Sequence, residues 1–179
     1  MNGQVMGGER VASTVALAGA GDEAAFARLV ATYHADMARV AFAICGDREL
    51  AEDAVQSSWL VAWRKLRSLR DPDRVRPWLL SVTANETRQL VRRRRGPVVE
   101  INLETPGDVR GDPSNGVERI DLRRALAHLS PDDRTVLAMH FAADLGPNEL
   151  AAAVGTSSSA ARKRLSRAID RLRKELRDG

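Results

Sequence analysis

The side chains best suited to binding chemistry in this sequence are cationic and hydroxyl groups near its C-terminus. Residues 157–179 carry eight Lys and Arg residues against three Asp and Glu residues, and they open on three consecutive serines. Arginine, lysine and serine bind DNA phosphates, and a serine at a helix start also caps it. The side chains that we expect to bond phosphate or to point toward base edges are Ser157, Ser158, Ser159, Arg162, Lys163, Ser166 and Arg167.

A helix, a turn and a second helix must position these side chains. Pro147 opens the short segment NELAAAV, Gly155 makes a tight turn, and a helix with a buried apolar seam follows. This order is typical of a helix-turn-helix motif, whose second helix lies in the DNA major groove. The alternative is an ordinary helical hairpin with a basic face. The small residues of the first helix and Gly155 favour the motif, because close helix crossing needs both.

A second cationic segment, residues 64–95, carries eleven basic and three acidic side chains. We expect a helix here that begins near Pro77, and its outer face carries Trp78, Asn85, Gln89, Arg92 and Arg93. An aromatic ring can stack on a base, amides can hydrogen-bond the edge of a base, and cations can bind the phosphates. This combination suits unpaired nucleic acid. Two alternatives remain open: the tryptophan packs against a neighbouring helix, and the arginines form a solvated helix end favoured by the helix dipole.

The segment from Asp47 to Arg67 predicts a helix with two distinct faces. The face that we expect in the core comprises Ala51, Val55, Ser58, Ala62 and Leu66. The opposite face is charged, with Leu60 at its centre. One interpretation is a solvated surface that carries a single leucine. The other is a docking face, in which charges fix the register on another protein and Leu60 supplies the desolvated contact.

Composition predicts an all-α protein of two small domains. The 179 residues are 44% hydrophobic but only 4% aromatic, so Ala, Leu and Val must build the core, and helices suit that composition. We expect a tail and short helix over 1–21, a helical domain over 22–95, a flexible linker over 96–117 and a helix-turn-helix domain over 118–179. The linker holds three prolines and four glycines.

Particular caps and core positions follow from the same patterns. Asp22, Asp47 and Ser130 are expected to cap helices. In the helix after Ser130, the residues expected to point inward are Val136, Leu137, His140 and Phe141. The seam of the last helix is expected to run through Ala161, Leu165, Ala168, Ile169, Leu172 and Leu176.

Other function classes find less support. The formal net charge is +4, with two cationic segments separated by acidic or neutral ones, which favours two contacts with one long polyanion. A basic protein of the membrane surface is the competing explanation, but neither segment pairs its charges with a bulky apolar face. His34, His128 and His140 lack metal-ligand spacing, and Cys45 has no partner. We expect no metal, no cofactor, no enzymatic activity and a cytoplasmic protein.

Four stretches together resemble the bacterial alternative sigma factors of the extracytoplasmic-function (ECF) type, from Ala18 to Leu176. They are GDEAAFARLVATYH, AEDAVQSSWLVAWRKL, RPWLLSVTANETRQLVRRRR and LSPDDRTVLAMHFAADLGPNELAAAVGTSSSAARKRLSRAIDRLRKEL. The resemblance implies a helical protein that binds core RNA polymerase, through the clamp and flap regions, and directs it to promoters. The pattern departs from the family at Ser57-Ser58, Gly146-Pro147 and Ser159-Ala160. A DNA-binding regulator that never touches polymerase is the alternative, and it leaves Leu60 unexplained.

The resemblance also implies roles for individual residues and an anti-sigma factor as a partner. Residues that would dock on the polymerase clamp are Glu52, Asp53, Gln56, Leu60 and Arg64. Residues that would engage the melting −10 element are Arg67, Arg70, Arg74, Trp78, Asn85, Gln89, Arg92 and Arg93. The helix around Arg162, Lys163 and Arg167 would read the −35 element as duplex.

Overall fold

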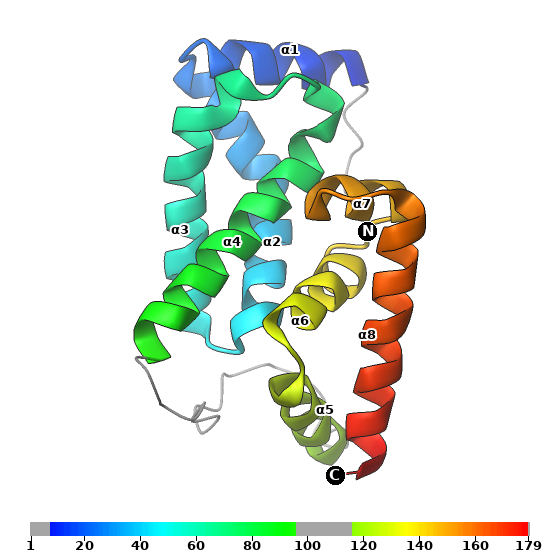
Figure 1. Cartoon of the computed structure of the whole chain (residues 1–179). Coiled ribbons are helices and arrows are strands. Elements are labelled where there is room, and N and C mark those ends of the chain that lie inside the picture. Colours follow the sequence, from blue (N-terminus) through cyan, green and yellow to red (C-terminus); the bar gives the residue numbers. More distant parts are fainter. Residues whose placement is uncertain (1–7, 96–115, 179) are drawn as a thin grey trace.

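The computed structural model describes residues 8–95 and 116–178, and every regular element in these ranges is helical (Figure 1). The predicted linker lies outside the described residues except for its last two positions. The N-terminal half comprises α1 (Gly8–Gly19), α2 (Glu23–Cys45), α3 (Arg48–Lys65), η1 (Leu66–Ser68), η2 (Pro72–Arg74) and α4 (Val75–Arg95). The C-terminal half comprises α5 (Gly116–His128), α6 (Pro131–Leu137), η4 (Ala138–Ala142), α7 (Pro147–Val154) and α8 (Ser158–Asp178).

Polar caps set the helix boundaries of the N-terminal half. The Asp22 carboxylate accepts a hydrogen bond from the Ala25 amide at 2.7 Å, and Asp47 accepts one from Leu50 at 2.9 Å. Between them, Gly46 ends α2 in the left-handed region at φ +72°, where a residue without a Cβ is favoured. The caps predicted at Asp22 and Asp47 are therefore confirmed.

The helices α2, α3 and α4 pack side by side, and α1 crosses one end of them (Figure 1). Small side chains such as Ala41, Ala54 and Ala62 are fully buried and allow the helix axes to approach closely. Larger residues, including Met37 and Leu80, fill the remaining space. The core face predicted for residues 47–67 is confirmed, because all five of its side chains are buried.

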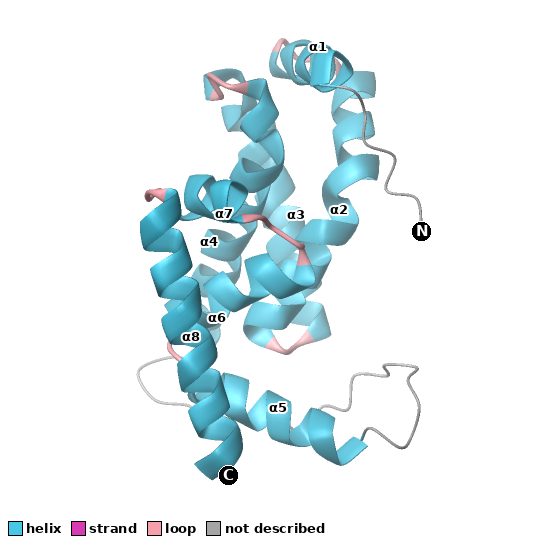
Figure 2. Ribbon diagram, turned by 90° about the vertical axis from the view of Figure 1, so that its right-hand side faces the viewer, coloured by secondary structure: helices cyan, strands magenta, loops and turns pink. Residues whose placement is uncertain are grey.

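In the C-terminal half, α5, α6 and α7 all pack against the long helix α8 (Figure 2). The Ser130 hydroxyl caps α6 by accepting the Asp133 amide at 3.1 Å. Asp133 is buried, and its carboxylate accepts a bond from Arg171 of α8 at 2.6 Å. A buried carboxylate needs such a partner, so this pair fixes how α6 sits on α8.

Two core predictions in this half are wrong. Phe141, expected to point inward with His140, is 66% exposed, and His140 is only partly buried. The reason is that residues 138–142 form a π-helical turn, which changes the rotation per residue and carries Phe141 outward. Leu176 is 43% exposed, because it lies on the last turn of α8, beyond Leu172, the last residue of this helix that packs against the cluster around Leu129 and Ala168.

The two halves pack against each other. Helix α2 contacts α6 and η4, and α4 contacts α7. One continuous cluster of buried apolar residues joins α2–α4 to residues of the C-terminal half such as Met139 and Leu150. Among the described residues, no helix is both long and apolar enough to cross a membrane.

Candidate polymerase and nucleic-acid interfaces

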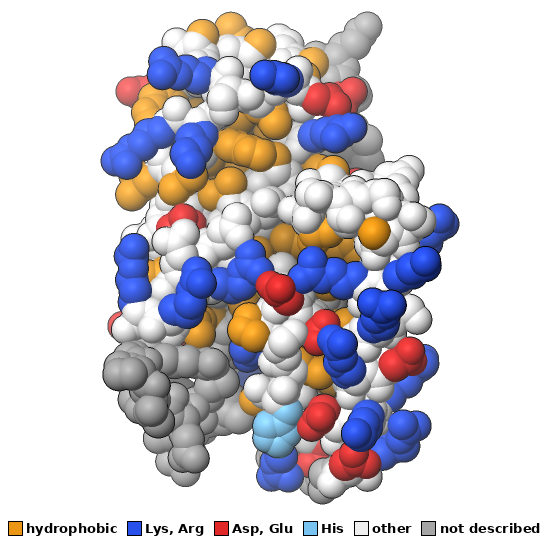
Figure 3. Space-filling model, in the orientation of Figure 1, with side chains coloured by type: hydrophobic (Ala, Val, Ile, Leu, Met, Phe, Trp, Pro, Cys, Tyr) orange, Lys and Arg blue, Asp and Glu red, His pale blue; other side chains and the backbone are white. Residues whose placement is uncertain are grey.

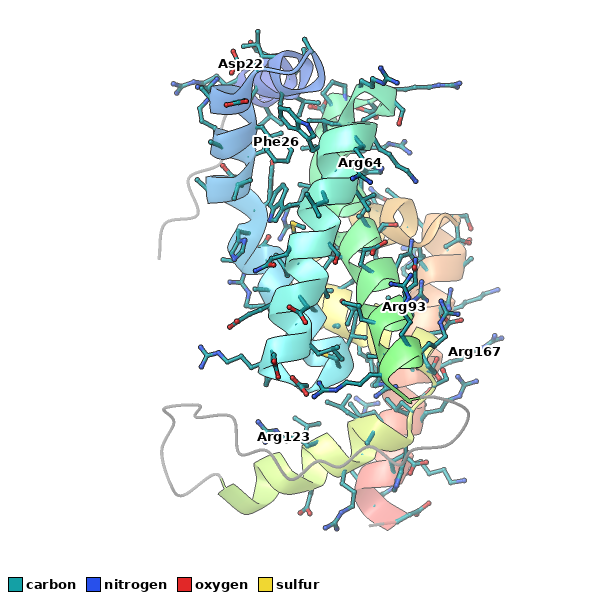
Figure 4. All side chains as sticks on the ribbon, turned by 90° about the vertical axis from the view of Figure 1, so that its left-hand side faces the viewer. Asp22, Phe26, Arg64, Arg93, Arg123 and Arg167 are labelled. Carbon is teal, nitrogen blue, oxygen red and sulfur yellow. The ribbon has the colours of Figure 1, made fainter. Side chains whose placement is uncertain are left out.

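The outer face of α3 is an exposed surface of mixed charge with an apolar centre. Leu60 is 60% exposed and lies among exposed charged side chains. We call the set that the sequence assigned to docking the α3 docking face, and all of its members are exposed: Glu52, Asp53, Gln56, Leu60 and Arg64. Figure 4 shows Arg64 projecting from the end of α3.

An aromatic cluster adjoins this face, and sequence reasoning missed one of its residues. Phe26 of α2 packs edge-on against Trp59 and Trp63, with ring centroids 5.5 and 4.8 Å apart. The Trp59 indole donates to His34 at 3.3 Å. Trp63 remains 41% exposed and lies three residues after Leu60, so the two share one face of the helix. That i, i+3 spacing is the sequence signal that indicates Trp63.

The outer face of α4 carries the residues expected to hold an unpaired strand. Asn85, Arg92 and Arg93 are exposed, whereas Trp78 and Gln89 are partly buried. Trp78 packs against the core, so the alternative that it contacts neighbouring helices is partly right. We call this set, Trp78, Asn85, Gln89, Arg92 and Arg93, the α4 strand face. The Asn85 carbonyl oxygen accepts a bond from Arg88, which leaves its amide group as the outward donor.

Three more arginines of the predicted −10 set lie before α4, on the connection from α3. Arg67 belongs to η1, Arg70 follows it, and Arg74 ends η2, where it pairs with Asp71 at 3.0 Å. All three are exposed. In Figure 3, Lys and Arg side chains flank apolar ones over the upper ends of α3 and α4. The structure therefore places these arginines at the N-terminal end of α4, and Arg92 and Arg93 at its other end.

The turn between α7 and α8 has the geometry expected of a helix-turn-helix. Gly155 ends α7 at φ +67°, and Ser157 caps α8 by accepting the Ala160 amide at 3.2 Å. Ser158 differs from the prediction, because its hydroxyl donates to Asn148 of α7 at 2.7 Å and so ties the two helices together. Ser159 is exposed, with its hydroxyl 3.1 Å from that of Ser157.

The cations of α8 divide into an inward and an outward group. Arg164 and Arg171 reach Asp132 and Asp133 of α6, at 3.0 and 2.6 Å, and so hold the helices together. An outward group, the cations Arg162, Lys163 and Arg167 together with Ser166, is exposed and has no hydrogen bond or ion pair with other described side chains. We call these four residues the α8 reading face. Figure 4 shows Arg167 pointing away from the helix pair.

Nothing in the described residues forms a site for a metal, since no group of three or more His, Cys, Asp or Glu side chains converges there. Cys45 is the single cysteine, and burial raises the pKa of its thiol to about 11. Its thiol is therefore protonated near neutral pH, as fits a packing residue.

Comparison with known proteins assigns both halves to one family. The family model of Sigma-70 region 2 matches residues 29–96, and that of Sigma-70, region 4, matches residues 119–172. The ECF RNA polymerase sigma factor SigL of Mycobacterium tuberculosis is 30% identical over 162 residues, which cover 87% of this chain and 92% of SigL. A Probable RNA polymerase sigma factor, RfaY of Xanthomonas campestris, is 30% identical over 89% of this chain, but this chain spans only 42% of RfaY.

A solved structure shares the fold over nearly the whole chain. The structure of CnrH in complex with the cytosolic domain of CnrY matches with a TM-score of 0.69 at 25% identity, covering 93% of this chain and 97% of CnrH. Both halves and their order are thus those of one protein family. The chain belongs to the sigma-70 family as an RNA polymerase sigma factor of the ECF type, and its function is the promoter-specific initiation of transcription.

Proposed function

We propose that three separate surfaces divide this function among them. The α3 docking face binds core RNA polymerase, the α4 strand face and the arginines before it bind the melted −10 element, and the α8 reading face reads the −35 element as duplex. The supporting observation is that Leu60 is 60% exposed among charged side chains and is left largely uncovered by the described residues of both halves. An exposed leucine ringed by charges matches the apolar core and polar rim of a protein interface.

The chemistry of the α4 strand face supports its assignment to a single strand. Trp78 offers part of a ring for stacking, Asn85 offers an oriented amide donor, and Arg92 and Arg93 offer charge to phosphates. A partly buried ring is held in place by its neighbours, so stacking a base on it costs little conformational entropy. The upstream arginines, Arg67, Arg70 and Arg74, extend the cationic surface along the strand.

The α8 reading face suits the major groove instead. Its side chains are exposed, three of them are long cations, and none is paired within the part of the chain that the structure describes, so they are available to reach base edges and phosphates. Ser157 and Ser159 lie at the start of α8, where backbone amides also attract phosphate. Ser158 belongs to the same proposed contact set, but its hydroxyl donates to Asn148 in the free chain, so a bond to phosphate requires that it leave Asn148.

Further parts of the proposal concern organisation and partners. We infer functional domains over 22–95 and 118–179, with 96–117 as their connection, in a cytoplasmic protein that is not an enzyme. A regulatory partner of the anti-sigma type, which occludes these surfaces, is also proposed. In its support, the related CnrH was solved in complex with the cytosolic domain of CnrY.

The α3 docking face is tested by a pull-down with core RNA polymerase. Leu60→Asp places a charge at the apolar centre, and Asp53→Arg reverses a charge beside it. We expect each variant to lose at least about 2 kcal/mol of binding free energy, or roughly thirtyfold in affinity, as at an interface hot spot.

Leu17→Asp is the matched control for this pull-down, because Leu17 is also an exposed leucine but lies on α1. We expect it to bind as the unaltered chain does. If Leu60→Asp and Asp53→Arg both bind core polymerase normally, the assignment of α3 is wrong.

A further inference from the structure

Helix α1 packs against the connection from α3 to α4, which carries three of the arginines assigned to the −10 element. It contacts both η1 and η2, as well as α2 and α3 (Figure 1). The helix precedes residues 29–96, the segment that matches Sigma-70 region 2, so that match assigns no role to it. Val15 and Ala18 are buried in the core. Helix α1 is therefore a fixed part of the bundle.

The end of α1 meets the backbone of η1 closely. Gly19 is the last residue of α1, and a Cβ on it would lie 3.4 Å from the Cα of Arg67 and 3.8 Å from the carbonyl carbon of Leu66. This is van der Waals distance for one carbon, and it leaves little space for a larger side chain. The Leu66 side chain is itself buried in the core. Both α1 and the core therefore hold η1 in place.

The rest of the connection is ordered by its own bonds. The Ser68 hydroxyl donates to the Lys65 carbonyl at 2.6 Å, and Asp71 caps η2 by accepting the Asp73 amide at 3.1 Å. Asp71 also pairs with Arg74 at 3.0 Å. These bonds fix the shape of the connection, whereas the packing on α1 and the core fixes its position. Such support holds binding groups in one geometry and lowers the entropic cost of binding.

We propose that α1 is a platform that sets the position of the η1–η2 connection, and that Gly19 is a positioning residue for base selection at the −10 element. The proposal rests on the function assigned above to Arg67, Arg70 and Arg74. Gly19 acts through the backbone of Arg67, whose side chain is exposed, and needs no contact with DNA. A larger side chain in place of Gly19 would displace η1 and its arginine, because overpacking shifts the backbone.

The test enlarges Gly19 by steps and leaves the arginines unaltered. Gly19→Ala adds only the Cβ for which there is space, whereas Gly19→Val adds two carbons beyond it. The φ of Gly19 is not positive, so neither substitution brings backbone strain. Ala16→Val is the matched control, because it adds the same branched side chain at an exposed position of α1. Arg67→Ala combined with Arg70→Ala removes two of the proposed DNA contacts themselves.

The first readout is the set of templates that core RNA polymerase transcribes with each full-length variant, from a duplex library of randomised upstream sequence. With the unaltered chain, Ala16→Val and Gly19→Ala, these templates should share the same −10 and −35 elements. Gly19→Val should keep the −35 element but lose about tenfold in discrimination among bases of the −10 element, as for one lost base contact. Unchanged discrimination with Gly19→Val, or an equal loss with Ala16→Val, would overturn the role of α1.

The arginine variant separates this inference from the function on which it rests. If Arg67→Ala with Arg70→Ala lowers −10 discrimination and Gly19→Val does not, the arginines read the strand and α1 does not position them. If the arginine variant leaves −10 discrimination unchanged, the function proposed for the connection is wrong, and the role of Gly19 falls with it.

The second readout is amide hydrogen exchange of the full-length chain, which detects local opening. Gly19→Val should raise exchange at residues 66–74 relative to Ala16→Val, with α3 and α4 equally protected in both. Unchanged exchange at residues 66–74 would contradict the platform. If Gly19→Val instead destabilises the whole N-terminal half, Gly19→Ser, which adds one atom beyond Cβ, takes its place. We then expect about a threefold loss of −10 discrimination, and no loss would overturn the proposal.

Discussion

The α8 reading face and the α4 strand face are both cationic, but they hold their side chains differently. On α8, Arg162 and Arg167 are exposed and pair with no other described residue, whereas Arg164 and Arg171 are paired with α6. On α4, Trp78 is partly buried and the Asn85 amide is already oriented by Arg88. A face that enters a duplex groove needs long free ends, and a face that holds a flexible strand benefits from rigid groups.

The largest expected effect is on duplex binding and tests the unpaired arginine side chains of α8. Replacing both Arg162 and Arg167 with alanine should cost about 2–6 kcal/mol of duplex −35 binding, since each arginine bonded to a base contributes ~1–3 kcal/mol. Binding to a titrated duplex oligonucleotide measures this loss. Arg173→Ala is the control, because Arg173 is exposed on the same helix and pairs only with Asp170. Equal losses in control and double variant would remove the α8 reading face.

A smaller effect tests the rigid ring of α4. Trp78→Ala should weaken single-strand binding by ~1–3 kcal/mol through lost stacking, with duplex −35 binding unchanged. Trp78→Phe should retain most of the affinity, because phenylalanine also stacks. Because Trp78 packs against the core, the melting temperature of each variant is measured alongside. If Trp78→Ala weakens duplex and single-strand binding equally, the two faces are not separate sites.

The smallest expected effect is on the salt dependence of DNA affinity, and it distinguishes the α8 reading face from the α4 strand face. Lys163→Ala should reduce the slope of log affinity against log salt for duplex DNA by ~1, as expected for one lost phosphate contact. Arg93→Ala should reduce the slope for a single strand by ~0.7 and leave the duplex slope unaltered. If Arg93→Ala reduces the salt slope for duplex DNA and Lys163→Ala does not, the duplex belongs to the α4 strand face and the assignments of the two faces are wrong.

Local patterns in the sequence predicted much of this molecule, because helix periodicity and caps depend on near neighbours. The buried face of α3, with Val55 and Ala62, follows from apolar spacing alone, and Asp22 and Ser130 cap the helices that they precede. The exposed Leu60 was predicted for the same reason, since it lies opposite the apolar positions.

The failures come from contacts that no local pattern contains. A π-helical turn displaced Phe141, and Ser158 bonds Asn148, ten residues earlier on the preceding helix. The packing of the two halves includes bonds from Arg76 to groups 67 and 73 residues away. Spacing within one helix cannot specify such pairs, so the arrangement of the two halves required the structure.

The most direct test of the central claim is to sequence the 5′ ends of transcripts made by core RNA polymerase with and without this protein. The account predicts that the protein confers start sites preceded by a shared pair of promoter elements, and that Leu60→Asp abolishes this selectivity. Start sites that do not change when the protein is added would contradict the account. So would full selectivity with both Leu60→Asp and the Arg162→Ala, Arg167→Ala double variant.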